Sequence, residues 1–149
     1  MAKIDTVPWQ LRMFSKSLKK KMKVRALKKF LGSATESKCL LITCGDNNGA
    51  INYHLRGRGG DWSWAEFESE TQADMEELLA APVHILDKST CRLPFAAGHF
   101  DLLVSIDVHE HLANPELLAA EFFRVLKTGG RALVTTPNRD NPQANASHR

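Results

Sequence analysis

The sequence lacks any apolar run that approaches the roughly 20 residues needed to span a bilayer. Its N-terminus carries lysines, but the hydrophobic stretch of a secretory signal peptide does not follow them. It has only three cysteines, Cys39, Cys44 and Cys91, and their odd number and unrelated spacings fit neither a disulfide framework nor a zinc site. These absences predict a cytoplasmic protein with reduced thiols and no transmembrane segment.

What is present is the composition of an ordinary globular protein. With 149 residues, 43% of them hydrophobic and 25% charged, the chain is expected to form one core. The net charge of +3 is unevenly distributed, because residues 1–37 hold ten Lys/Arg against two Asp/Glu (+8) and residues 38–149 hold ten against fifteen (−5). The basic segment suits a phosphate-rich partner, such as nucleic acid or an anionic lipid surface. The alternative is a helix face that only water contacts.

Hydrophobic periodicity divides the chain into alternating helices and strands. Residues 8–31 favour one amphipathic helix, whole or broken, and residues 1–37 are expected to form a basic N-terminal helix and link. Strands are expected at 39–42, 62–67, 83–86, 101–107 and 131–135, helices at about 51–55, 69–80 and 115–126, and a polar tail at 139–149. Asn114 is expected to cap the last helix, and residues 127–130 to close it. This alternation predicts a parallel sheet covered by helices on both faces.

The loop after the first strand is the first place to look for a ligand, because open parallel sheets bind ligands where the strand order reverses. It reads Cys44-Gly45-Asp46-Asn47-Asn48-Gly49. Glycine lets backbone approach a ligand closely, and asparagine tolerates left-handed backbone. The next helix would present free N–H groups to an anion, either a dinucleotide pyrophosphate or the methionyl carboxylate of S-adenosylmethionine. A hairpin turn at Asn48-Gly49 is the alternative, and the helical spacing of Ile51 and Leu55 argues against it.

The second strand ends in acidic residues. In adenosine-binding α/β folds an acid at this place accepts hydrogen bonds from ribose hydroxyls. Glu66 lies about 20 residues past the loop, as that rule expects. Glu68 is the competing candidate, and each of the two is also acceptable as a plain surface carboxylate.

An ordered set of short segments fills the second half of the chain. They are Leu93-Pro94-Phe95, Phe100-Asp101, Asp107-Val108-His109-Glu110-His111-Leu112, Phe123-Arg124-Val125-Leu126-Lys127-Thr128-Gly129-Gly130 and Thr136-Pro137-Asn138. In this order they resemble the signature segments of the type 11 family of class I S-adenosylmethionine-dependent methyltransferases. The resemblance covers residues 38–138, which would form the cofactor-binding domain. It implies a Rossmann-like, doubly wound, mostly parallel sheet that lacks the last two strands of the family.

The resemblance also implies which residues bind S-adenosylmethionine. The first loop would hold the methionyl part, Glu66 the ribose, and the segment after the third strand the adenine, while the end of the fourth strand would face the reactive methyl group. The residues concerned are Thr43, Cys44, Gly45, Asp46, Asn47, Gly49, Glu66, Ser89, Thr90 and Asp107. Leu41 and Thr43 depart from the family, which has an acid and a glycine there, and Asn47 stands where a third glycine is usual.

Methyl transfer requires alignment more than acid or base catalysis, because the sulfonium already makes the methyl group electrophilic. A general base is needed only for hydroxyl or similar acceptors. His109 is the candidate, since the histidine pKa of about 6.5 suits proton removal near neutral pH. The alternative is that His109 and His111 orient the loop or pack against the following helix. No metal site is expected, because Asp107, Glu110 and His111 lack a distant fourth ligand.

Taken together, these patterns predict methyl transfer from S-adenosylmethionine to an unidentified, small-molecule acceptor. The alternative is a non-catalytic binding module that keeps the methyltransferase fold. A NAD-dependent oxidoreductase is disfavoured, because its Gly-x-Gly-x-x-Gly motif would meet Thr43, Gly45 and Asn48. The fifth strand, 131–135, would lie at a sheet edge with neither Pro nor Lys inside it. This predicts a homo-oligomer formed through that edge, exposed hydrophobic surface, or a truncated product.

Overall fold

The computed structural model describes residues 7–32, 37–45, 48–58 and 60–136. At its centre is a five-stranded parallel sheet with the order β3-β2-β1-β4-β5. The strands are β1 (Lys38–Thr43), β2 (Asp61–Glu66), β3 (Val83–Ile85), β4 (Phe100–Ile106) and β5 (Leu126–Thr135). The predicted doubly wound α/β architecture is confirmed. The predicted tail at 139–149 lies outside the described residues.

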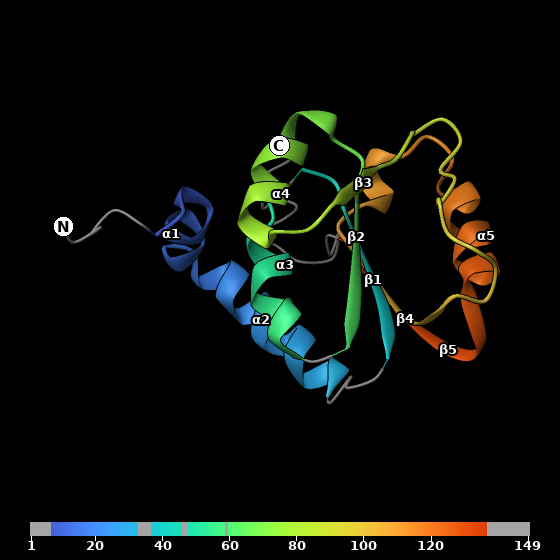
Figure 1. Cartoon of the computed structure of the whole chain (residues 1–149), viewed down its shortest axis with the longest axis horizontal. Helices are drawn as coiled ribbons and strands as arrows, with labels where there is room; N and C mark the ends of the chain where they lie inside the picture. The colour runs from blue at the N-terminus through green and yellow to red at the C-terminus, as the bar shows by residue number, and fades with distance from the viewer. Residues whose placement is uncertain (1–6, 33–36, 46–47, 59, 137–149) are drawn as a thin grey trace, which may run out of the picture.

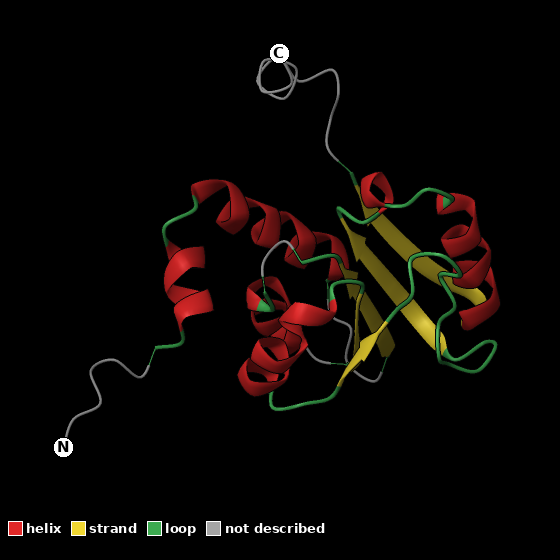
Figure 2. Ribbon diagram, turned by 90° about the horizontal axis from the view of Figure 1, so that it is seen from above, coloured by secondary structure: helices red, strands yellow, loops and turns green. Residues whose placement is uncertain are grey.

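Helices cover both faces of the sheet (Figures 1 and 2). One face carries α1 (Trp9–Ser15), α2 (Leu18–Leu31), α3 (Ala50–Leu55) and α4 (Gln72–Leu79), and the other carries α5 (Pro115–Val125). Short 3₁₀ turns follow three of the elements: η2 (Arg56–Arg58), η3 (Ser69–Thr71) and η4 (His109–His111). The chain changes face at β1, which pairs with β2 on one side and β4 on the other.

The central strands are apolar on both faces, as a sheet between two helical layers requires. In β1, Cys39 and Leu41 join the core beneath α1 to α4, while Leu40 and Ile42 join the core beneath α5. Leu40, Leu41 and Ile42 are all completely buried. Burying such a side chain contributes about 1.5–3 kcal/mol, so β1 anchors the loop that follows it.

The basic N-terminal segment forms two helices. The break falls at Lys16 and Ser17, and the Ser17 hydroxyl caps α2 by accepting a hydrogen bond of 3.2 Å from the Lys20 backbone N–H. Gly32, with φ of 58°, ends α2 in a conformation that favours glycine. Val24, Leu27 and Leu31 face the sheet and fix α2 against it. The break therefore allows a sharp turn between helices that periodicity alone would join.

The end of α5 differs from the sequence-based expectation. The helix stops at Val125, and β5 begins at Leu126, which pairs with Phe100. The register then shifts so that Arg131 pairs with Leu102, which makes residues 127–130 a bulge in the strand instead of a separate turn. Gly130 is required there, because a Cβ atom would lie 2.9 Å from the Lys127 carbonyl oxygen.

The start of α5 is also only partly as expected. Asn114 occupies the N-cap position and Pro115 the first turn, but the Asn114 side chain makes no capping hydrogen bond. The first backbone N–H groups of a helix have no partner inside the helix, and a capping side chain normally accepts a hydrogen bond from one of them. Pro115 has no N–H, so α5 has one fewer such group to satisfy.

An ion-pair cluster joins α5 to the long connection between β3 and β4. Arg124 donates hydrogen bonds of 2.8 Å to the Phe95 carbonyl and 2.7 Å to the Leu93 carbonyl. Glu121 accepts one of 2.8 Å from the Leu93 backbone N–H and one of 2.8 Å from Arg124 Nε. The Arg124 guanidinium holds the pKa of Glu121 down at about 2. The two sequence segments around Leu93 and Arg124 are therefore held together by one carboxylate and one guanidinium.

Candidate functional site

The loop after β1 and the acid at the end of β2 meet at the carboxyl edge of the sheet. Thr43 and Glu66 are in register on neighbouring strands. Glu66 Oε1 accepts a hydrogen bond of 2.7 Å from the Thr43 hydroxyl, and Oε2 accepts one of 2.7 Å from the Gly45 backbone N–H. A further bond of 2.8 Å comes from the Glu68 backbone N–H. Glu66 is thus the residue that fixes where the loop begins.

Glu66 is buried, with 1% of its surface exposed. Burial raises the pKa of Glu66, while the hydrogen bonds from Thr43, Glu68 and Gly45 act in the opposite direction. Burial has the larger effect because it disfavours the charged form. The carboxyl group therefore sits in an environment that tunes its protonation, which is common at functional sites.

Gly45 gives the loop its direction. Its φ of +73° lies in the left-handed region, and a Cβ atom on it would lie 2.9 Å from Glu68 Cγ. Glu68 crosses the loop here and forms an ion pair of 2.6 Å with Lys88, while the Cys44 thiol donates a hydrogen bond of 3.6 Å to the same carboxylate. Hydrogen bonding to Lys88 lowers the pKa of Glu68. The glycine thus keeps open a space that the Glu68 side chain occupies.

The rest of the loop leads into α3. Gly49 has φ of +94°, and a Cβ atom there would lie 3.3 Å from Met75 Cγ of α4. The glycine therefore lets α3 pack closely against α4, and the helix that follows it excludes the hairpin alternative. Asp46 and Asn47, both predicted cofactor contacts, lie outside the described residues.

The segment after β3 forms a compact turn. Asp87 Oδ1 accepts hydrogen bonds of 2.7 Å from the Ser89 backbone N–H and 2.6 Å from the Ser89 hydroxyl. These bonds lower the pKa of Asp87. Ser89 and Thr90, the predicted adenine contacts, are both exposed, and Lys88 between them and Asp87 reaches back to Glu68. The turn is thus connected to the loop after β1 through one ion pair.

Asp107 follows β4, on the other side of β1 from Glu66. It has φ of 52°, which is unusual for a residue with a side chain. Its backbone N–H donates a hydrogen bond of 2.9 Å to the Thr135 carbonyl. Its carboxylate accepts hydrogen bonds of 3.1 Å from the Thr135 hydroxyl and 2.5 Å from Lys23 Nζ. The Lys23 ion pair ties α2 to the end of β4. Lys23 and Asp107 are 84 positions apart, and no pattern in the sequence predicts that they pair.

His109 lies at the start of η4, with its ring edge-on to Phe122 of α5 at 5.9 Å between centroids. Its Nδ1 atom is buried and has no hydrogen-bond partner. The contact with Phe122 matches the packing alternative, and the buried Nδ1 is enclosed by protein. His111 lies 3.8 Å from Glu110 and is exposed.

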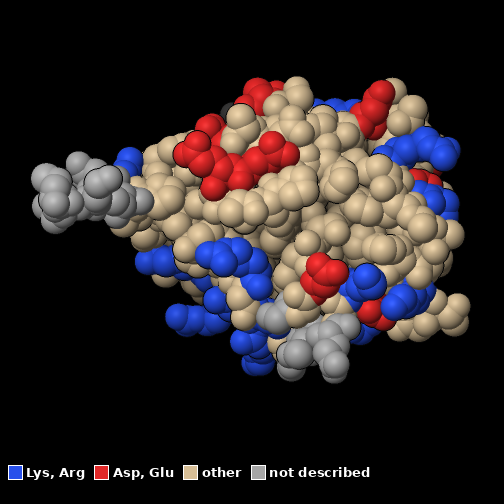
Figure 3. Space-filling view, viewed as in Figure 1, with Lys and Arg blue, Asp and Glu red and all other residues tan. Residues whose placement is uncertain are grey.

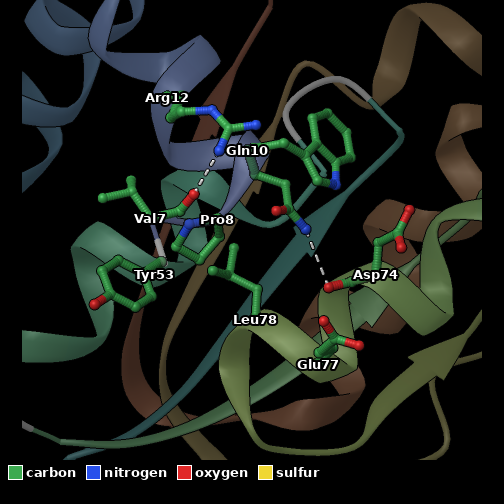
Figure 4. Close-up of a pocket in the computed structure, with 9 residues that line it drawn as sticks. Val7, Pro8, Gln10, Arg12, Tyr53, Asp74, Glu77 and Leu78 are labelled. Carbon is green, nitrogen blue, oxygen red and sulfur yellow. Dashed lines mark hydrogen bonds between the residues drawn. The ribbon is translucent and has the colours of Figure 1, made fainter. Parts of the chain in front are cut away.

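One cavity, of about 410 Å³, lies between α1, α3 and α4, with Tyr53, Asp74 and Leu78 on its wall (Figure 4). A cavity of about 130 Å³ reaches Asn48 and Ala50 at the start of α3 and is closed by Phe14 of α1. The N-terminal helices therefore cover the end of the loop. Among the described residues, no group of three or more His, Cys, Asp or Glu is arranged to hold a metal ion.

Comparisons with known proteins identify the family of the chain. Residues 42–134 match a family described as "Methyltransferase domain". The matched region is more than half of the chain. The chain therefore belongs to this family, the type 11 class I S-adenosylmethionine-dependent methyltransferases, and the cofactor of the family is S-adenosylmethionine.

Individual relatives share parts of the chain. The sarcosine/dimethylglycine N-methyltransferase of Aphanothece halophytica is 32% identical over 94 residues, which are 60% of this chain and 34% of that protein. A methyltransferase from Aquifex aeolicus has a TM-score of 0.62 at 14% identity, covering 90% of this chain and 76% of its own. The geranyl diphosphate C-methyltransferase of Streptomyces coelicolor has a TM-score of 0.64 at 17% identity, covering 85% of this chain and 52% of its own. At these identities the two structures show the fold alone.

The residues at the carboxyl edge fit the family's cofactor. The loop follows β1, where the strand order reverses, and the Glu66 carboxylate at the end of β2 accepts a hydrogen bond from the Gly45 backbone N–H beside it. Asp87, Lys88 and Lys23 are three residues of this region that the sequence analysis missed. The Asp87-Lys88-Ser89 turn had a signal, because Asp two residues before Ser favours a local side-chain turn. Lys23 and Lys88 had none.

Proposed function

We propose that this chain binds S-adenosylmethionine beside Gly45 and Glu66 and transfers its methyl group to a small-molecule acceptor. The observation that carries the proposal is the Glu66 carboxylate, which holds Thr43 and the Gly45 backbone N–H at 2.7 Å each. This bond pair brings the loop after β1 and the end of β2 to one place. A single adenosyl ligand needs both to converge there.

Glu66, which ends β2, and Glu68, two residues later, have different roles in this proposal. Both oxygens of Glu66 already accept bonds from the protein, so Glu66 positions the loop beside the ribose. Glu68 has 30% of its side chain exposed and is held by the exposed Lys88, so it reaches ribose hydroxyls once that ion pair opens. Ser89 and Thr90 border the adenine side, and Asp107 borders the methyl side. Thr43, Cys44, Gly45 and Gly49 line the methionyl side, and the contacts expected from Asp46 and Asn47 fall outside the described residues.

When bound, S-adenosylmethionine supplies a methyl group that is already electrophilic. The protein's task is therefore to align the acceptor and to exclude water. For a hydroxyl acceptor, we propose that the His109 imidazole takes the proton. His109→Ala would then abolish methylation of hydroxyl acceptors and leave cofactor binding unchanged. If His109 only packs against Phe122, His109→Phe retains activity.

The acceptor is proposed to be small because the Aphanothece relative is named for sarcosine and dimethylglycine, both small amines. The three cysteines are free and buried, as in a protein that keeps reduced thiols in the cytoplasm. None of the helices in the described part of the chain combines the length and hydrophobicity that crossing a bilayer requires. Assembly through the open edge of β5 stays a prediction.

Thermal unfolding with and without ligand tests the proposal. Binding to the native state alone raises stability by about 2.7 kcal/mol at a hundredfold excess over Kd. We expect such a rise with S-adenosylmethionine and with S-adenosylhomocysteine, and we expect Glu68→Gln to reduce both. Glu77→Gln, a change on the exposed side of α4, is the matched control.

A second measurement distinguishes the enzyme from the alternative, a non-catalytic module. Formation of S-adenosylhomocysteine in the presence of small amines reports turnover. Ligand-dependent stabilisation without turnover on any amine or hydroxyl acceptor would favour the module. No stabilisation by either ligand would end the cofactor proposal.

A further inference from the structure

α2 carries two opposed stripes. Its inner stripe, Val24, Leu27 and Leu31, is buried against the sheet. Leu18 and Met22 point the other way, with 68% and 58% of their surfaces exposed. Such large aliphatic side chains gain nothing from the fold in that position. They therefore call for an explanation outside the fold.

The outward stripe also contains two cations. Leu18, Met22, Arg25 and Lys29 recur at i, i+4, i+7 and i+11, which is one face of an α-helix. Arg25 and Lys29 are both exposed, and neither forms an ion pair with any residue that the structure describes. The four side chains, which we call the outer stripe, thus combine aliphatic and cationic groups on one line.

The surroundings of the outer stripe are basic. Residues 7–32 contain nine Lys and Arg and no Asp or Glu. Figure 3 shows Lys and Arg gathered over α2 on the lower left, whereas Asp and Glu gather over α4 above. Lys16, Lys19 and Lys21 are exposed beside the outer stripe. The face therefore attracts an extended negative surface rather than a single anion.

We propose that the outer stripe of α2 docks this protein on the surface of an anionic lipid bilayer. Basic residues draw a helix to anionic headgroups, and aliphatic side chains between them enter the boundary with the acyl chains. The long stems of Arg25 and Lys29 let their charges remain at headgroup level while the stripe approaches the bilayer. Val24, Leu27 and Leu31 stay in the core throughout, so docking requires no unfolding.

A nucleic acid is the competing anionic partner, and the residue types argue against it. Binding to nucleic acid combines cations with aromatic side chains that stack on bases or with polar groups that read their edges. The outer stripe has no aromatic side chain, and half of it is aliphatic. Leu18 and Met22 would lie unused against a phosphate backbone. The aliphatic pair is thus what distinguishes the two partners.

Co-sedimentation of the full chain with vesicles, without S-adenosylmethionine, tests the proposal. We expect binding to vesicles of phosphatidylcholine mixed with phosphatidylserine and little binding to phosphatidylcholine alone. Arg25→Gln with Lys29→Gln should lower the partition coefficient roughly 25-fold, at about fivefold for each cation. Leu18→Ser with Met22→Ser should lower it on the order of tenfold at constant charge.

Matched variants and a competitor make the outcomes decisive. Arg92→Gln with Lys127→Gln removes the same charge from other elements and should change partitioning less than twofold. Circular dichroism checks that each variant is folded. Equal binding by wild type and by Leu18→Ser with Met22→Ser would overturn the proposal. So would tighter binding to RNA than to anionic vesicles. Because no cofactor is present, these results do not depend on the proposed function.

Discussion

The pair of Glu121 and Arg124 supports a quantitative prediction about stability. Glu121→Ala removes an ion pair worth up to about 1 kcal/mol at a partly exposed site. It also leaves the buried backbone N–H of Leu93 without its acceptor, at a cost of about 1–3 kcal/mol. We therefore expect the free energy of unfolding to fall by about 3 kcal/mol at pH 7. Urea denaturation followed by far-UV circular dichroism measures this.

The pH dependence of the same variant provides an independent check. Because the pKa of Glu121 is lowered to about 2 in the native state, the carboxylate stabilises the fold above its unfolded pKa near 4.5. That contribution is lost as the pH falls through the native pKa. The difference between wild type and Glu121→Ala should thus be constant above pH 5 and shrink below pH 4.5. A difference below about 0.5 kcal/mol at pH 7, or one that does not shrink in acid, would refute the reasoning. Glu77→Ala serves as the control.

Three further outcomes are expected. Gly45→Ala should lower the free energy of unfolding by about 1–2 kcal/mol because of the positive φ at this position, and should weaken stabilisation by S-adenosylmethionine. The control is Gly57→Ala, where an added Cβ atom meets nothing. It should change stability by less than about 0.5 kcal/mol in the same thermal assay. Lys23→Met should destabilise by about 1–2 kcal/mol, since it leaves a largely buried carboxylate unpaired, and equal urea midpoints for this variant and wild type would contradict that. Cys44, whose pKa burial raises to about 12, should react with iodoacetamide at pH 8 far more slowly in the native than in the unfolded protein.

The architecture was predictable from the sequence because it rests on local patterns. The continuous apolar run of β1 and the helical spacing of Ile51 and Leu55 are visible without a structure. The break at Ser17 and the bulge before Arg131 were harder, because both depend on how the segment meets another part of the sheet. Boundaries of this kind follow tertiary packing more than propensity.

The candidate site was predictable only where motif and topology coincide. Gly45 and Glu66 were expected to converge because parallel strands present their carboxyl ends at one edge. The Gly45 backbone nitrogen lies 2.7 Å from Glu66 Oε2. The ion pairs of Lys23 and Lys88 were missed. Long, flexible side chains choose partners according to the finished surface, which carries no periodic signal in the chain. The role of His109 as a general base stays a prediction.

The hydrogen bonds of Glu66 couple the end of β1 to the end of β2. The same carboxylate accepts hydrogen bonds from the hydroxyl of Thr43, which ends β1, from the Gly45 N–H in the loop, and from the Glu68 N–H after β2. A displacement of either strand end must therefore stretch the hydrogen bonds that Glu66 accepts from the other. A change that removes this carboxylate would therefore release the end of β1, the loop and the start of the segment after β2 together.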